Sequence, residues 1–192
     1  MRILTIILFL VCVTAFGVTP AEFNKIRSLA EKGDSEAQCK LAEFYDWGDH
    51  VTLNEQEAVK WYMKAAEQGY ARAQTNIADR YYLGNRGLPE DYKEAVKWYR
   101  RASEQGSDWA LARLGLCYER GWGIPVNFVE AYACFNVAGT NDKTFAAWRD
   151  SIAKEKMTPS QIEAGQKRSI ELKAKIDSRK ASKEKKWWQF WR

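Results

Sequence analysis

The chain has 192 residues, of which 46% are hydrophobic and 29% charged, so it is long and apolar enough to build a folded core. Its single histidine, His50, excludes most histidine-based metal sites and argues against a catalytic triad. The net charge of +5 is uneven, because residues 167–192 carry ten basic and three acidic side chains while the remainder sums to −2. A mildly acidic body with a basic end is not typical of a nucleic-acid-binding domain, so we expect no nucleic acid as a partner.

The first 17 residues have the pattern of a targeting segment. Arg2 precedes an apolar run from Ile3 to Phe16, which is shorter than the roughly 20 residues that a membrane-spanning helix needs. Small residues favour cleavage after Ala15 or Gly17. We therefore predict a signal peptide over residues 1–17 and a secreted or periplasmic protein; without cleavage the segment would be a membrane anchor.

Two blocks recur along residues 21–153. The block Glu57–Gly69 returns as Glu94–Gly106, and a weaker copy runs from Glu130 to Gly139. A second block precedes each of them and begins at Ala37, Ala73 and Ala110. Both blocks place apolar or small residues at helical spacing, which predicts two short helices in each repeat. Such a unit buries its apolar face only by stacking on its neighbours, so a repeat array is expected.

Glycine and proline mark the connections between these helices. Gly84–Pro89 and Gly121–Pro125 are typical helix-ending turns, and Gly69 and Gly106 suit the left-handed position after a helix. Residues 21–31 match the second helix of a repeat, which predicts an N-terminal half-repeat.

The C-terminal part is predicted to close the array. Residues 144–153 fit the first helix of a fourth unit, and Thr158 begins another helix with Gln161 completing a capping box. A thin apolar stripe, formed by Ile162, Ser169, Leu172 and Ile176, indicates that residues 158–178 cap the last repeat. The basic, tryptophan-rich tail, residues 179–192, is expected to fray.

The repeats share positions for alanine, leucine-glycine, tyrosine, turn glycines and tryptophan-tyrosine. This pattern resembles the Sel1-like repeat, a relative of the tetratricopeptide repeat. The resemblance covers about Ala30 to Asp150. Cys134 replaces the tryptophan of the third copy, and His50 stands where the first copy would have its second turn glycine. The resemblance implies an all-α fold, a right-handed superhelical solenoid of antiparallel helix pairs, and a non-catalytic scaffold that binds a protein partner.

The same resemblance implies a binding face. In tetratricopeptide-like arrays the first helix of each repeat lines a concave groove, which here would hold Glu36, Glu43, Asp46, Arg72, Asp79, Tyr82, Trp109 and Glu119. Five of these residues are acidic and one is basic, so the groove would suit a basic or amphipathic peptide. The alternative is that each is an ordinary residue of a solvated helix face.

The sequence contains no nucleophile elbow, phosphate-binding loop, dinucleotide fingerprint or paired metal-ligand motif. We therefore predict no catalytic residue, no metal and no cofactor, and we expect His50 to be an exposed turn residue. A cell-wall-related hydrolase, suggested by cysteine-rich relatives, is the weakest hypothesis. Cys117 and Cys134 fall in the two helices of the third repeat, so an exported chain could join them by a disulfide; otherwise they are two buried thiols.

The tail combines lysines with large aromatic residues, namely Lys185, Lys186, Trp187, Trp188, Phe190 and Trp191. Tryptophan and lysine together favour the membrane interface, which makes peripheral membrane contact a second hypothesis for the function. The tail could instead dock on a protein surface, including the chain's own groove, or it could have no function. The identity of the partner and the oligomeric state do not follow from the sequence.

Overall fold

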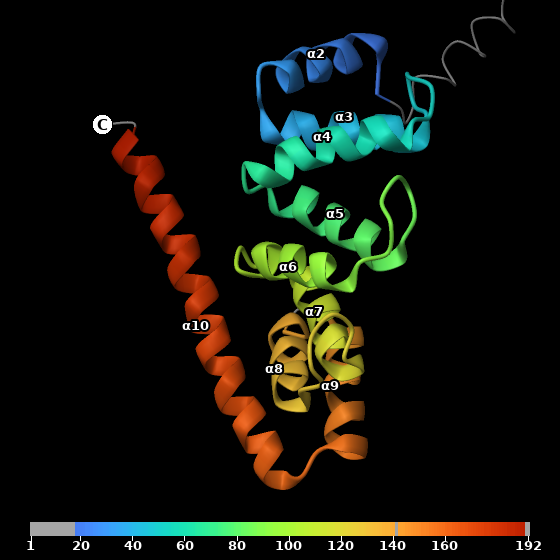
Figure 1. The fold of residues 1–192 in the computed structure, drawn as a ribbon. Coiled ribbons are helices and arrows are strands. Elements are labelled where there is room, and N and C mark those ends of the chain that lie inside the picture. Colours follow the sequence, from blue (N-terminus) through green and yellow to red (C-terminus); the bar gives the residue numbers. More distant parts are fainter. Residues whose placement is uncertain (1–17, 141, 191–192) are drawn as a thin grey trace, which may run out of the picture.

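The computed structural model describes residues 18–140 and 142–190, and these form helices joined by short turns, without strands (Figure 1). The helices in chain order are α2 (Pro20–Glu31), α3 (Ser35–Trp47), α4 (Glu55–Glu67), α5 (Ala71–Leu83), α6 (Tyr92–Ser103), α7 (Asp108–Arg120), α8 (Phe128–Ala138), α9 (Lys143–Lys156) and α10 (Pro159–Phe190). Each helix from α2 to α8 packs against the next one in the chain, which confirms the predicted solenoid of helix pairs. The three repeats are α3–α4, α5–α6 and α7–α8.

Local signals explain where most helices begin and end. Thr19 forms a full capping box with Glu22 at α2. Polar side chains accept hydrogen bonds from the first turns of α3, α4, α6, α7, α8 and α9, namely Asp34, Asn54, Asp91, Ser107, Asn127 and Asp142. The first helix of each repeat ends at a glycine in the left-handed conformation: Gly48, Gly84 and Gly121.

His50 adopts the left-handed backbone that Gly123 has in the third repeat, with φ values of 58° and 68°. Side chains other than glycine rarely adopt this conformation because Cβ crowds the backbone. Two contacts offset the cost: Nε2 lies 2.6 Å from the carbonyl oxygen of Val18, and the ring stacks on Phe23. His50 is therefore a turn residue, as predicted, but its ring is packed against α2.

Small and aromatic side chains at equivalent positions build the core. The second helix of each repeat contributes two alanines without exposed surface, which are Ala58 and Ala65, Ala95 and Ala102, and Ala131 and Ala138. Between each pair lies an aromatic ring that is at most 2% exposed, from Tyr62, Tyr99 and Phe135. The alanines allow close helix approach and the rings fill the space that remains.

A repeated pair of glutamines joins the two helices of a repeat. Gln38 is 4% exposed and accepts a hydrogen bond from Gln68 at 2.7 Å. One repeat later, Gln74 is 4% exposed and accepts from Gln105 at 2.7 Å. Each buried amide also donates to a backbone carbonyl of the preceding helix. Both buried amides are thus satisfied, which avoids the cost of an unpaired polar group.

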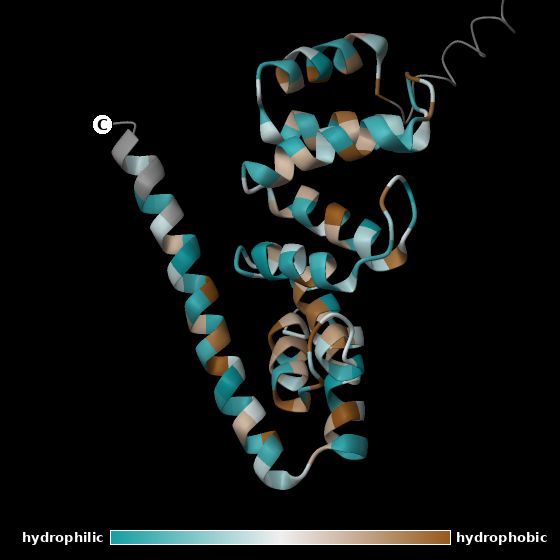
Figure 2. Ribbon diagram, viewed as in Figure 1, coloured by the Kyte–Doolittle hydropathy of each residue, from teal (hydrophilic) through white to brown (hydrophobic). Residues whose placement is uncertain are grey.

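α10 turns back and runs along one side of the array (Figure 1). Its first half packs on α8, where Gly165 lies so close to Tyr132 that a Cβ would be 2.7 Å from the ring. Asn136 donates to the Ser169 hydroxyl at 2.9 Å. Figure 2 shows apolar residues gathered on α8, whereas α10 is mostly hydrophilic. The thin stripe predicted from the sequence therefore does contact the array.

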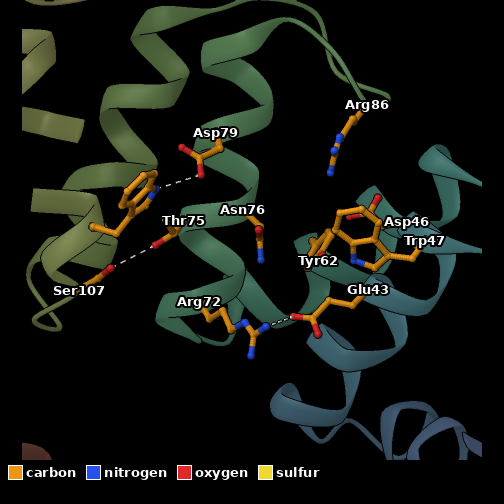
Figure 3. Close-up of a pocket in the computed structure, with 11 residues that line it drawn as sticks. Glu43, Asp46, Trp47, Tyr62, Arg72, Thr75, Asn76, Asp79, Arg86 and Ser107 are labelled. Carbon is orange, nitrogen blue, oxygen red and sulfur yellow. Dashed lines mark hydrogen bonds and ion pairs between the residues drawn. The ribbon is translucent and has the colours of Figure 1, made fainter. Parts of the chain in front are cut away.

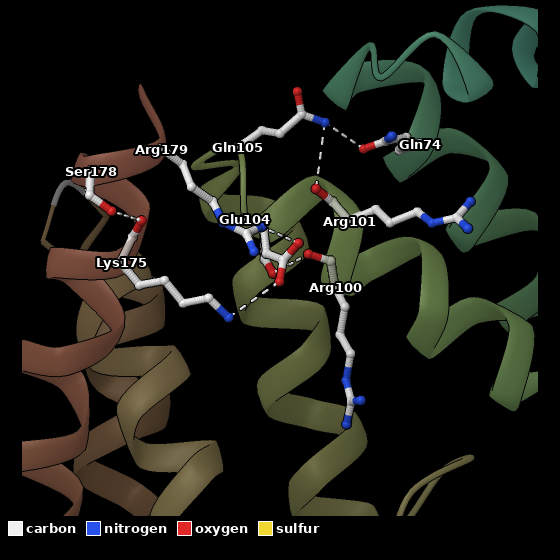
Figure 4. A network of polar contacts seen from close by, with 9 residues as sticks. Gln74, Arg100, Arg101, Glu104, Gln105, Lys175, Ser178 and Arg179 are labelled. Atoms are coloured by element: carbon white, nitrogen blue, oxygen red, sulfur yellow. Dashed lines mark hydrogen bonds and ion pairs between the residues drawn. The ribbon is translucent and has the colours of Figure 1, made fainter. Parts of the chain in front are cut away.

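The helix continues past residue 178 to Phe190, so the predicted fraying of the tail is wrong. Glu104, in the turn between α6 and α7, binds Lys175 and Arg179 and holds α10 beyond its apolar stripe (Figure 4). Lysine, arginine, glutamate and alanine then extend the helix because they favour helical backbone. In the described part of the chain, no helix is both long and apolar enough to cross a membrane.

Candidate partner-binding groove

An open groove crosses the first helices of the three repeats (Figure 3). It holds a cavity of about 480 Å³ whose walls are Glu43, Asp46, Trp47, Tyr62, Arg72, Thr75, Asn76, Asp79, Arg86, Ser107 and Trp109. Helical spacing explains the floor, because residues 72, 75, 76 and 79 share one face of α5. The cavity thus lies across the first helices of the repeats, where the family resemblance implied a groove.

Five of the eight predicted groove residues line this cavity: Glu43, Asp46, Arg72, Asp79 and Trp109. Glu36 does not, and its exposed carboxylate pairs with Lys40 at 2.7 Å. Tyr82 packs against Trp122 instead, with ring centroids 5.4 Å apart. Glu119 accepts from Lys156 at 2.6 Å and is only 10% exposed.

The acids of the groove are paired with basic side chains of the fold, which the count of five acids to one base did not include. Asp46 and Arg80 form an ion pair in which each side chain is 5% exposed, and the guanidinium contacts both carboxylate oxygens. Glu43 accepts from Arg72 at 2.7 Å. Burial raises the pKa of Glu43, and the charge of Arg72 offsets this only in part.

Asp79 is engaged in the same way. It accepts from the Tyr99 hydroxyl at 2.5 Å and from the indole N–H of Trp109 at 3.3 Å, and Arg113 Nε lies 3.5 Å away. The guanidinium of Arg113 also lies over the ring of Tyr82. The sequence-based charge count failed because it included neither Arg80 nor Arg113.

Two exposed tryptophans stand at the ends of the groove lining. Trp47 is the last residue of α3 and is 70% exposed, and Trp109 lies in the first turn of α7 and is 45% exposed. The ring of Trp109 packs on Phe145, with centroids 6.1 Å apart. Large exposed aromatic side chains at a cavity are typical of contact sites.

Several residues of the lining were missed by sequence reasoning, among them Trp47, Asn76 and Arg86. Asn76 follows Arg72 by four residues, so the helical stripe alone could have identified it. Trp47 follows the predicted Asp46 directly, at the end of the same helix. Arg86 lies in the turn after α5, at the position that His50 and Gly123 occupy in the neighbouring repeats, so the repeat period could have identified it. Its positive φ of 51° and the hydrogen bond from Arg80 to its carbonyl oxygen fix its place.

A second, more apolar cavity of about 640 Å³ adjoins the groove between α2 and α3. Its lining includes Val18, Ile26, Leu29 and Phe44, and it shares Trp47 with the first cavity. Leu29 is 40% exposed. The two cavities therefore form one continuous surface around the exposed tryptophan.

The cysteines of the described residues lie in the core. Cys39, Cys117 and Cys134 are free and buried, so the Cys117–Cys134 bridge is not formed in the structure. Burial raises the pKa of each of these thiols to about 12. Within residues 18–140 and 142–190, no group of three or more histidine, cysteine or carboxylate side chains is placed to hold a metal ion.

The predicted tail residues are only partly described. Lys185 is exposed, and Trp188 is 76% exposed on the last turns of α10. The side chains of Lys186, Trp187 and Phe190, and all of Trp191, lie outside the described part of the chain, as do residues 1–17 of the predicted signal peptide.

Comparison with known proteins places these features in a family. The family model of the Sel1 repeat matches residues 35–70, 71–107 and 110–142. The crystal structure of a Sel1 repeat protein from Oxalobacter formigenes is similar, with a TM-score of 0.62 and 32% identity, covering 66% of this chain and 96% of that chain. So is c5321, a protective antigen of uropathogenic Escherichia coli with an SLR fold, with a TM-score of 0.54 and 28% identity over 90% of this chain and 45% of c5321.

A curated relative, Chitin synthase regulatory factor 3 of Schizosaccharomyces pombe, is 35% identical over 68 residues. The match covers 35% of this chain and 7% of that protein, so the chain corresponds to a small part of the relative's length. The three segments matched by the family model coincide with the pairs α3–α4, α5–α6 and α7–α8 and make up more than half of the sequence. The chain therefore belongs to the Sel1 repeat family.

Proposed function

We propose that the chain is an exported, non-catalytic scaffold that holds a segment of a partner protein in the groove of α3, α5 and α7. Sel1 repeat proteins usually mediate protein–protein interaction and are generally non-catalytic. The observation that carries the proposal is the pair of exposed tryptophans, Trp47 and Trp109, that line a single cavity with a polar floor.

The floor between the tryptophans suits an extended peptide. The side-chain amide of Asn76 has no hydrogen bond to another described residue, so it can donate to and accept from a partner's backbone. The tryptophans can cover apolar side chains on either side of that contact. Because these groups sit on packed helices, little ordering entropy is lost on binding.

Photo-crosslinking at a single position tests this site. A photoreactive amino acid at position 76 should give a defined adduct with the partner in cells, identified by mass spectrometry. The same group at Lys97, an exposed position of α6 outside the groove, is the matched control. Adducts that are equal at both positions would contradict groove binding.

A double substitution then measures the contribution of the aromatic side chains. Trp47→Ala with Trp109→Ala should reduce the adduct from position 76 at least tenfold, because aromatic anchors dominate such interfaces. Trp188→Ala removes an equally exposed tryptophan from α10 and should leave the adduct unchanged. Loss of the adduct only in the Trp188 variant would place the contact on the tail instead.

The export part of the proposal rests on residues 1–17, whose basic start and apolar run are typical of a signal peptide. The intact mass of the natural protein, recovered separately from soluble envelope, membrane and medium, tests it. Loss of the first 15 or 17 residues would support export. A full-length, membrane-bound chain would mean that the segment is an anchor.

A second candidate function is favoured by the end of α10. The helix continues to Phe190 and exposes Trp188 and Lys185, a combination that suits a membrane surface with anionic lipid. Sedimentation with anionic liposomes, with and without residues 187–192, separates the candidates. Binding that depends on the tail supports membrane contact, and no binding by the full chain rejects it.

A further inference from the structure

The most exposed charged groups in the groove are arginines: the side chain of Arg72 is 63% exposed, against 25% for Glu43 and 27% for Asp79. Asp46 is 5% exposed and bound to Arg80, and Asp79 already accepts from Tyr99 and Trp109. These acids have used most of their hydrogen-bonding capacity inside the fold. A basic partner would therefore have to break existing pairs to reach them.

Two arginines of the same cavity remain available. Arg72 makes one ion pair, with Glu43, and its side chain is still 63% exposed. Arg86 has no acidic partner among the described residues, and its guanidinium lies 5.3 Å from the ring centroid of Trp47. Figure 3 shows the guanidinium of Arg86 directed into the open space of the groove and that of Arg72 directed toward Glu43. Both have donors left for a ligand.

The backbone holds Arg86 in place over the groove. Its left-handed φ of 51° is uncommon for a residue with a side chain, and such a conformation persists only where neighbouring contacts enforce it. The contact here is the hydrogen bond from the buried Arg80 to the Arg86 carbonyl oxygen. Arg80, which pairs with Asp46 inside the fold, thus also fixes the position of Arg86.

The cations continue beyond the groove. Arg72 also lines a neighbouring cavity of about 410 Å³, together with Arg179 and Lys180 of α10. The acid of that cavity, Glu104, is bound to Lys175 and Arg179. From Arg86, past Arg72, to α10, the basic side chains are therefore more exposed than the acids that they pair with.

We infer that the partner segment held in the groove is acidic, with carboxylate side chains beside at least one bulky apolar residue. This inference rests on the proposed function and names its partner class. Carboxylates fit the fork of a guanidinium, and the apolar side chain packs on Trp47 or Trp109. The expected ligand thus has the opposite charge from the basic peptide that the sequence alone suggested.

Selection from a random dodecapeptide library on the purified protein tests the inference without a known partner. Enriched peptides are synthesised with a dye and their binding measured by fluorescence anisotropy. We expect enriched sequences rich in aspartate and glutamate. Replacing their carboxylates by the matching amides should weaken binding about tenfold, as should Arg86→Gln or Arg72→Gln.

Arg101→Gln is the matched control, because it removes the same charge from α6 outside the groove lining and should change affinity less than twofold. Enriched peptides that lack acids but lose binding in the Trp47→Ala, Trp109→Ala variant would overturn the inference and leave the proposed function standing. If no enriched peptide depends on these tryptophans, both fail. Acidic peptides that bind Arg86→Gln and Arg72→Gln as tightly as the unchanged protein would also overturn the inference.

Discussion

The repeat array and α10 are held together in different ways. Within the array, equivalent alanines and rings recur at each interface, and the buried Asp46–Arg80 pair joins two neighbouring repeats. The first half of α10 packs closely along α8, but its outer half depends largely on one carboxylate, Glu104. Stability is therefore spread over the array and the first half of α10, but concentrated at a single point on its outer half.

The largest effect should come from breaking the buried ion pair of the array. Arg80→Met leaves Asp46 buried without a partner, and we expect the free energy of unfolding to fall by about 3–5 kcal/mol. Urea denaturation followed by circular dichroism measures it. Arg101→Met, on the exposed side of α6, should change stability by less than about 0.5 kcal/mol. A similar loss of unfolding free energy in the two variants would contradict a buried ion pair between Asp46 and Arg80.

The array should also protect its thiols. Burial raises the pKa of Cys39, Cys117 and Cys134 from 9 to about 12, so the reactive thiolate is roughly a thousandfold rarer at a given pH. A thiol reagent at pH 8 should modify none of the three in the folded mature chain. All three should react once the chain is unfolded without reductant. If only one reacts, Cys117 and Cys134 form a disulfide.

A smaller effect is expected where α10 meets α8. Gly165→Ala would place a Cβ 2.7 Å from the Tyr132 ring, and overpacking of this kind costs about 1–3 kcal/mol. Alanine favours the helix by about 1 kcal/mol, so the net loss should be at most about 2 kcal/mol. Thermal denaturation measures it, with Gln166→Ala, at an exposed neighbour, as the control. A gain in stability would show that α10 does not pack closely here.

The smallest effect should appear at the outer half of α10. Burial alone would raise the pKa of Glu104, but Arg179 and Lys175 outweigh it and lower the pKa. The carboxylate therefore stabilises docking of α10 above the unfolded pKa of about 4.3, and this contribution is lost as the pH falls through the lower folded value. This contribution to the free energy of docking should be less than about 1 kcal/mol, because the side chain of Glu104 is 37% exposed.

Release of the outer half of α10 from the array can be followed by energy transfer between dyes attached at Lys64 and Lys185. Transfer should fall as the pH drops below the usual range of a glutamate carboxyl, because the lowered pKa of Glu104 delays its protonation to that range. In Glu104→Gln it should already be low at pH 7 and should not change further on acidification. An unchanged pH dependence in that variant would assign the movement to another group.

The sequence predicted what is repeated and missed what occurs once. The period of about 37 residues placed the helices, and the apolar stripe through Ser169 and Ile176 indicated which face of α10 contacts the array. Periodicity gives no information on pairs between repeats, so the link from Asp46 to Arg80 was missed and the groove was expected to be acidic. The left-handed turn position of Arg86 recurs as His50 and Gly123, but only the second repeat places an arginine there, and spacing does not indicate that its side chain lies at the groove.

The hydrogen bond between Lys175 and Glu104 joins residues 71 positions apart. An array of repeats alone contains mainly local contacts and can fold or unfold one unit at a time. A helix that reaches back across α8 to the turn after α6 closes a long loop, so the last units should unfold together as one cooperative block. Removal of α10 should therefore replace a single sharp unfolding transition by a broad one that begins at the C-terminal repeat.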